Sequence, residues 1–275
     1  MRLIIISAVL AMASLQTAQA QVLSMGKKAF RAVASQSKST EVYAGDTKVE
    51  YKKVAALGGI DKRDISNLEI GESIGLGSNS QIDIGLVYST VDANLKKLGG
   101  IAEVSTHYWY DAYTNDHFNV TLGFGFRAPG DNQGGADFVS LSDGLTKYDY
   151  SLNLGYDMND FKIGLNTRFT DRNFIAAKSQ SLVELYVNYY ATSSVLLNVS
   201  YLSFNTSGGG DVGDVIAGTT SFQFVKEQYD TLSLGVGYGF NEACSVDLHF
   251  AQKLTSNAKN TDFSNTVALG YTHNY

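Results

Sequence analysis

Residues 266–275 read Thr-Val-Ala-Leu-Gly-Tyr-Thr-His-Asn-Tyr, and their alternation decides the fold class. Val267, Leu269, Tyr271 and Tyr275 would share one face, whereas small and polar residues fill the other. A period of two residues is typical of a β-strand, because its side chains point alternately to opposite sides of the sheet. Such a strand leaves an unpaired edge unless the sheet closes on itself. The stretch therefore predicts the last strand of a closed barrel.

The same ten residues resemble the C-terminal signal of bacterial outer-membrane β-barrel proteins, in which alternating apolar residues end in an aromatic one. His273 departs from this pattern, since an apolar or aromatic residue is usual at its place. The resemblance implies that the barrel-assembly machinery of a Gram-negative bacterium recognises Val267, Leu269, Tyr271 and Tyr275.

The first twenty residues predict a secretory signal peptide. Arg2 supplies a positive start, Leu3 to Leu15 an apolar run, and Thr17-Ala18-Gln19-Ala20 a cleavage site of small residues, so the mature chain would begin at Gln21. The alternative, an N-terminal membrane anchor, is disfavoured because the apolar run is short for a spanning helix.

The composition after residue 20 suits a transmembrane barrel. No apolar run reaches the ~18 residues of a spanning helix, so a helical membrane protein is excluded. The chain has 27 Gly, 17 Tyr and 14 Phe but 1 Pro, and its charged fraction of 17% is below that of ordinary soluble domains. The net charge of −6 argues against nucleic acid as a partner. A single cysteine, Cys244, rules out an internal disulfide, and alternation places it on the outward face.

Residues 41–275 predict an all-β, closed antiparallel transmembrane barrel of about twelve strands, each ~10 residues long. Residues 21–40 are expected outside the barrel wall, as a periplasmic or lumenal helix or as a disordered lead-in. The alternating segments are Thr47 to Ala55, Leu68 to Leu76, Ile82 to Tyr88, Val104 to Tyr110, Phe118 to Phe126, Tyr148 to Tyr156, Phe161 to Phe169, Val183 to Tyr189, Val195 to Tyr201, Leu232 to Phe240, Cys244 to Leu254 and Val267 to Tyr275. Short periplasmic turns are expected to alternate with longer external loops.

The inward faces of these segments hold the candidate functional residues. Most inward positions are Ser, Thr, Asn or Gly, a composition typical of a wettable channel wall. Twelve strands enclose a narrow lumen, which Trp109 or an inward Tyr186 could obstruct. The lumen-lining candidates are Trp109, Asp111, Lys147, Asp149, Lys162, Arg168, Glu184, Asp247 and His249.

Turn lengths predict which of these residues oppose one another. A two-residue turn at Met158-Asn159 sets Asp149 opposite Arg168, and opposed charges on one face attract. A three-residue turn at Asn241 to Ala243 sets Gly237 opposite Asp247 and Gly235 opposite His249. A similar turn at Tyr113 to Asn115 sets Asp111 opposite His117.

No catalytic, metal or cofactor site is expected. Ser245, Asp247 and His249 share one inward face, but alternate residues of a strand lie ~7 Å apart, so Ser245 is beyond hydrogen-bond reach of His249. The four histidines are scattered, and no cysteine accompanies them in a ligand pattern.

One stretch resembles a bacterial barrel family associated with the meta pathway of phenol degradation. It runs Phe126-Arg127-Ala128-Pro129-Gly130-Asp131, then a glycine-bearing loop, then Lys147-Tyr148-Asp149-Tyr150-Ser151-Leu152. The Thr common between Pro and Gly in that family is missing. The resemblance implies an outer-membrane protein that passes small molecules, hydrophobic ones included, and assigns no functional residue.

The sequence thus predicts a porin-like outer-membrane channel, not an enzyme, whose partners are outer-membrane lipid and small solutes. Inward carboxylates outnumber inward cations among the predicted strands, which favours cations or neutral solutes weakly. Two alternatives stay open: a closed structural or adhesive barrel acting through its external loops, and an outer-membrane hydrolase.

Overall fold

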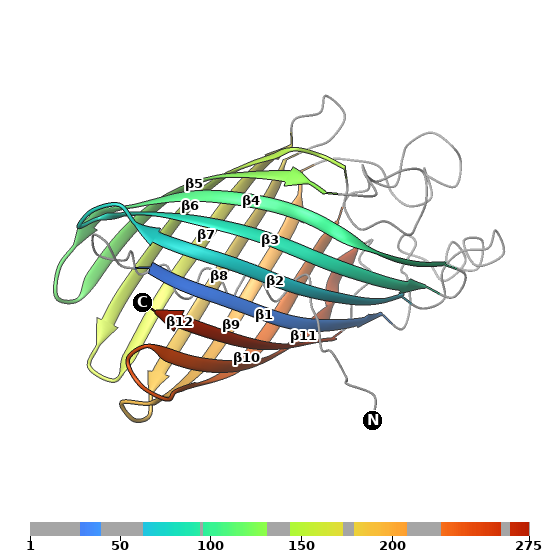
Figure 1. The fold of residues 1–275 in the computed structure, drawn as a ribbon. Helices are drawn as coiled ribbons and strands as arrows, with labels where there is room; N and C mark the ends of the chain where they lie inside the picture. The colour runs from blue at the N-terminus through green and yellow to red at the C-terminus, as the bar shows by residue number, and fades with distance from the viewer. Residues whose placement is uncertain are drawn as a thin grey trace.

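The computed structural model is a closed barrel of twelve antiparallel strands (Figure 1). Each strand pairs with its neighbours in sequence, and β1 pairs with β12 to complete the ring. The predicted all-β class and closed barrel are therefore confirmed. The structure describes residues 28–39, 63–93, 96–130, 144–172, 179–207, 227–259 and 265–274.

The strands are β1 Lys28–Ser39, β2 Arg63–Gly75, β3 Ser80–Ala93, β4 Lys96–Thr114, β5 Phe118–Pro129, β6 Lys147–Met158, β7 Phe161–Arg172, β8 Gln180–Tyr190, β9 Val195–Thr206, β10 Gln228–Gly239, β11 Cys244–Lys259 and β12 Asn265–Asn274. Among the described residues, no helix is both long enough and apolar enough to cross a membrane.

The first strand corrects the prediction that residues 21–40 lie outside the barrel wall. Lys28–Ser39 pair along their whole length with β2 and, over ten positions, with β12. Val33 is 2% exposed and packs inside the barrel against Ala251 and Ala268, which fixes this strand between its neighbours. The weak sequence signal has a physical cause: Ala32 and Ala34 on the outward face are too small to give a strong apolar alternation.

Two other predictions lie outside the described residues. One is the signal peptide over residues 1–20, and the other is a first strand over Thr47 to Ala55. The predicted final aromatic, Tyr275, also lies outside them.

The outer surface of the barrel is apolar. Leu234, Leu248 and Leu269 are about half exposed, while their neighbours along each strand point inward. Exposed apolar side chains in such a continuous band fit a surface in contact with lipid. Glu72 is the exception, because its register partners Phe30 and Ile84 place it on this outward face.

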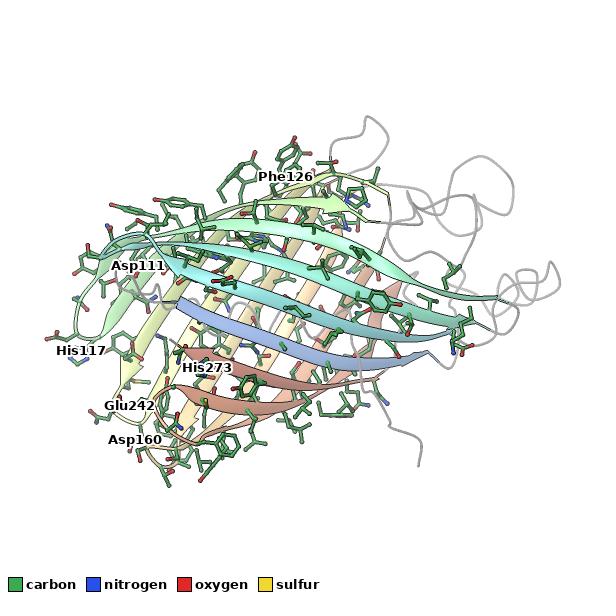
Figure 2. The ribbon with its side chains drawn as sticks, viewed as in Figure 1. Asp111, His117, Phe126, Asp160, Glu242 and His273 are labelled. Carbon is green, nitrogen blue, oxygen red and sulfur yellow. The ribbon has the colours of Figure 1, made fainter. Side chains whose placement is uncertain are left out.

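Aromatic side chains stand near both ends of the outer surface. Phe161 and Tyr189 stack with ring centroids 4.7 Å apart at one end, and Phe126 pairs with Tyr148 at 5.7 Å toward the other. Figure 2 shows Phe126 projecting outward at the end opposite to Asp160. Aromatic rings at both borders of an apolar band are typical of transmembrane barrels.

Five short hairpins gather at one end of the barrel, which we call the short-hairpin end (Figure 1). Its members join β2 to β3, β4 to β5, β6 to β7, β8 to β9 and β10 to β11. Figure 2 places Asp111, His117, Asp160 and Glu242 at this end. In the last hairpin, the Asn241 side chain accepts hydrogen bonds from the backbone of Ala243 and Cys244. A side chain that bonds to nearby backbone in this way stabilises a tight turn.

The predicted alternation of short turns and long loops is wrong at one connection. Only residues 94–95 separate β3 from β4, at the end opposite to the short hairpins. The reason is strand length: β3 has 14 residues and β4 has 19, so the pair extends into sequence that was assigned to a loop.

Candidate functional site

The barrel lumen is the candidate functional site. Its wall is mostly polar, as predicted, and many small polar side chains on it are buried. They include Thr121, Asn153, Asn166, Asn198, Ser200 and Ser233. The nine candidates from the sequence all occupy inward positions of their strands. The structure separates them into several groups along the barrel.

Asp149 is the centre of the first group, the charge cluster. The carboxylate is fully buried and receives two hydrogen bonds from Arg127, from Nε to Oδ2 at 2.6 Å and from Nη2 to Oδ1 at 2.8 Å. Thr170 donates to Oδ1 at 2.5 Å, and His107 Nε2 lies 3.1 Å from Oδ2. Paired, two-point hydrogen bonds between guanidinium and carboxylate are among the strongest in proteins. Asp149 is thus held by three neighbouring side chains.

Glu103 and Lys147 complete the charge cluster. Glu103 Oε2 lies 3.5 Å from Arg127 Nη1 and 3.4 Å from Lys147 Nζ. The cluster therefore joins β4, β5, β6 and β7 across the inner wall. Since each carboxylate in it already faces a cation, Asp149 and Glu103 offer little negative charge to a passing solute.

The predicted ion pair between Asp149 and Arg168 is wrong. The turn falls at residues 159–160, one position later than expected, because Asn159 adopts the left-handed conformation with φ 48°. Asparagine tolerates this conformation better than most residues. The shift moves the pairing by two residues, so Asp149 faces Thr170 and Arg168 faces Ser151. A shift of two keeps each side chain on its predicted inner face.

Aromatic side chains lie flat against the inner wall over glycines. A Cβ atom at Gly123 would come within 2.3 Å of the Trp109 ring, and one at Gly164 within 2.1 Å of the Tyr186 ring. These pairs are direct register partners on neighbouring strands. The glycines thus provide the space into which the rings fold. Trp109 also donates from Nε1 to Asp83 at 2.6 Å, which fixes its ring along the wall.

The remaining candidates in this part of the wall have local partners. Glu184 is buried and accepts a hydrogen bond of 3.0 Å from the Asn166 amide. Asp111 accepts one of 2.6 Å from Thr121, its register partner. The predicted opposition of Asp111 and His117 is therefore wrong, because β4 continues to Thr114 and carries an irregularity after Asp111.

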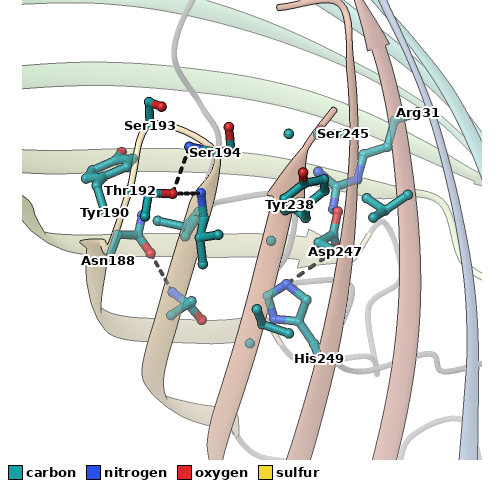
Figure 3. A pocket seen from close by; sticks show the side chains of 18 residues that line it. Arg31, Asn188, Tyr190, Thr192, Ser193, Ser194, Tyr238, Ser245, Asp247 and His249 are labelled. Carbon is teal, nitrogen blue, oxygen red and sulfur yellow. Dashed lines mark hydrogen bonds and ion pairs between the residues drawn. The ribbon is translucent and has the colours of Figure 1, made fainter. Parts of the chain in front are cut away.

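A pocket lies toward the short-hairpin end of the barrel, lined by residues of β1, β8, β9, β10 and β11 (Figure 3). It encloses about 200 Å³, and Gly235, Gly237 and Gly239 line one side of it. Gly237 faces Asp247 and Gly235 faces His249, as the turn at Asn241 to Ala243 predicted. The absence of side chains at these glycines gives the pocket its room.

Asp247, His249 and Arg31 form the charged side of this pocket. His249 Nε2 lies 3.4 Å from Asp247 Oδ2, and Arg31 Nη2 lies 3.5 Å from the same carboxylate (Figure 3). Asp247 reaches Arg31 by crossing β12 above Gly270, where a Cβ would come within 2.5 Å of its oxygens. Arg31 was missed because it belongs to β1. The alternation of Ala29, Arg31 and Val33 was the available signal.

The longer strands change the charge balance of the lumen. Among the side chains that the structure describes, the inward carboxylates are Glu69, Asp83, Glu103, Asp111, Asp149, Asp157, Glu184 and Asp247, and the inward cations are Arg31, Arg127, Lys147, Lys162, Arg168, Arg172 and Lys253. Arg31 and Arg172 lie outside the predicted segments, whereas Lys253 is an inward position of the segment Cys244 to Leu254 that the sequence count left out. The predicted excess of negative charge, and with it the weak preference for cations, is nearly removed.

Apolar side chains also reach the inner wall, which the sequence analysis did not anticipate. Leu182, Leu202, Phe204 and Tyr229 form a buried inward cluster on β8, β9 and β10. Phe204 and Tyr229 stack with ring centroids 4.8 Å apart. Within the described ranges, no group of three or more His, Cys, Asp or Glu side chains is arranged to hold a metal ion.

No protein-family model matches the chain, and no curated protein matches it in sequence. Solved structures do match. An outer-membrane channel from Pseudomonas putida F1 superposes with a TM-score of 0.72 at 11% identity, over 94% of this chain and 98% of that one. The chain has the fold of an outer-membrane channel. This agreement supports, for the fold, the family resemblance of the stretch from Phe126 to Leu152.

Two further structures share the architecture. The NanC porin superposes with a TM-score of 0.53 at 11% identity, over 88% of this chain and 98% of that one. The translocator domain of the autotransporter NalP from Neisseria meningitidis gives 0.51 at 10% identity, over 96% and 95%. The fold is thus shared by an outer-membrane channel, a porin and the translocator domain of an autotransporter.

Proposed function

We propose that the chain is an outer-membrane channel through which small solutes pass passively. The observation that carries this proposal is the inner wall: it is lined by small polar groups, and the rings of Trp109 and Tyr186 fold onto Gly123 and Gly164. A polar wall favours water and polar solutes, and the two rings lie along this wall instead of across the lumen.

The proposal includes location and partners. The chain is exported by a cleaved signal peptide over residues 1–20 and inserts into the outer membrane of a Gram-negative bacterium. Its short-hairpin end faces the periplasm, and lipid covers the apolar outer surface. The assembly machinery recognises Val267, Leu269, Tyr271 and Tyr275. Leu269 and Tyr271 are exposed on the outer surface, where such recognition is possible.

The solutes include small hydrophobic compounds. The family resemblance of the stretch from Phe126 to Leu152 supports this range.

Conductance measurements test the proposal. The refolded mature protein, inserted in a planar bilayer in potassium chloride, is expected to give discrete and reproducible current steps. A heat-sensitive shift in gel mobility verifies that the protein is folded. A nearly even charge balance of the lumen predicts a reversal potential close to zero in a potassium chloride gradient. Folded protein that gives no current would contradict the proposal and favour a closed barrel acting through its loops.

A further inference from the structure

Arg168 differs from the other cations of the inner wall near it. Its Nε is buried without a hydrogen-bond partner, and no ion pair to its guanidinium is found among the described residues. Arg127 is held by Asp149, and Lys147 lies beside Glu103. The side chain of Arg168 is partly exposed on the lumen. Its guanidinium is therefore a positive group with no counter-charge in contact among the described residues.

The neighbours of Arg168 add hydrogen-bonding groups. Ser151 is its direct register partner on β6, and Asn153 is the next inward residue of that strand. Diagonal neighbours across two strands lie ~7–8 Å apart, within reach of a long side chain. Asn153 is 4% exposed, and neither its amide nitrogen nor its amide oxygen has a hydrogen-bond partner. Buried amides without partners are uncommon and indicate a group that a ligand or water satisfies.

Charges of both signs lie in this part of the wall. The inward cations are Arg127, Lys147, Arg168 and Arg172, and the inward carboxylates are Glu103, Asp149 and Glu184. Arg127 repels Arg168, and Asp149 and Glu103 attract it from beyond contact distance. Arg168 is the cation of this group for which the described residues show no ion pair. The planar fork of a guanidinium matches the two oxygens of a carboxylate.

We infer that Arg168 and Asn153 form a binding station for the carboxylate of an organic anion that passes through the lumen. The inference rests on the proposed channel function and names its solute class.

Current block by butyrate tests the station, with butyramide as the neutral probe of similar shape. In the wild-type channel, butyrate is expected to interrupt the potassium chloride current at lower concentration than butyramide. Arg168→Gln should raise the half-blocking concentration of butyrate about tenfold, as loss of a charged hydrogen bond implies, and leave butyramide unchanged. Arg168→Lys, which keeps the charge but loses the fork, should fall between. Equal block by both probes, or equal block in wild type and Arg168→Gln, overturns the inference.

The matched control is Lys162→Gln. Lys162 is another inward cation of β7, but it lies 3.6 Å from Asp157 and so already has a counter-charge. Its loss should not change butyrate block, and a change equal to that of Arg168→Gln would show a general field effect instead of a site. Asn153→Ala, which keeps the charges, should weaken block as well.

Saturation-transfer NMR separates this inference from the channel proposal. It detects butyrate binding to the refolded protein in detergent without any current. Binding that Arg168→Gln abolishes, in a protein that conducts nothing, would support the station and contradict the channel. Current without Arg168-dependent binding would support the channel and contradict the station.

Discussion

Replacing Asp149 with alanine is expected to lower the free energy of unfolding by about 3–5 kcal/mol, the usual cost of removing one partner of a buried ion pair. Asp149 is fully buried and the side chain of Arg127 is 14% exposed, so the guanidinium would stay in the wall without its main partner. Thr170 and His107 would lose an acceptor at the same time. Urea unfolding in lipid vesicles, followed by the fluorescence of the single tryptophan, measures the change.

Asp157→Ala is the matched control for this prediction. Asp157 also faces a cation, Lys162 at 3.6 Å, but its side chain is 45% exposed near the short-hairpin end. Exposed ion pairs contribute about 0–1 kcal/mol, so this variant should unfold almost like the wild type. The double variant Asp149→Ala with Arg127→Met should recover part of the loss, because no charge is left without a partner. Equal losses for Asp149→Ala and Asp157→Ala would contradict the account of the charge cluster.

Alanine at Gly164 or Gly123 is expected to reduce the single-channel conductance. The new Cβ would overlap the ring of Tyr186 or Trp109, so the ring must leave the wall and project into the lumen. Overpacking of this kind also lowers the free energy of unfolding by about 1–3 kcal/mol. Conductance in potassium chloride and urea unfolding of the same preparations measure both effects.

Gly237→Ala provides the comparison for these glycine variants. It occupies an inward position too, but the nearest heavy atom to its added Cβ lies at 3.5 Å, an ordinary contact distance. The single-channel conductance of this variant should equal that of the wild type. An equal reduction of the current by all three substitutions would mean that any replacement of an inward glycine has this effect. The rings of Trp109 and Tyr186 would then not control the width of the lumen.

The sequence predicted which faces of the strands point inward better than it predicted their pairing. Face assignment depends on a period of two that is local to each strand, whereas pairing depends on where each turn begins. At Asn241 to Ala243 the turn was placed correctly, and Gly235 faces His249 as predicted. At Asn159 a displacement by one residue moved Asp149 from Arg168 to Thr170.

Two features of the site depend on contacts that no single strand encodes. Arg127 reaches Asp149 from the neighbouring strand, and Arg31 reaches Asp247 across β12 because Gly270 lets the carboxylate pass. The contact between Arg31 and Asp247 exists only once β1 has closed the barrel against β12. The contact between Arg127 and Asp149 depends on the register of β5 and β6.

His273 contacts a side chain on the neighbouring strand. It departs from the usual C-terminal signal, and its register partner is Cys244. Cys244 Sγ lies 3.1 Å from His273 Nδ1, so the imidazole has a polar neighbour on the next strand. Cys244, which alternation places on the outward face, thus has a polar contact there.

The pairing of β1 with β12 has a consequence for the kinetics of assembly. Ala29 lies beside Asn274, so the ring closes through a contact between segments separated by almost the whole described chain. Contacts of such long range form slowly, since the entropy of the intervening chain must be lost before they are made. Each hairpin can form from strands that are neighbours in the sequence, whereas the pairing of β1 with β12 requires both ends of the barrel sequence to be in place. Closure is therefore expected to be the slow step. Variants that weaken the pairing of β1 with β12 should delay the appearance of the gel band of the folded protein, identified by its heat-sensitive mobility, more than variants in any hairpin.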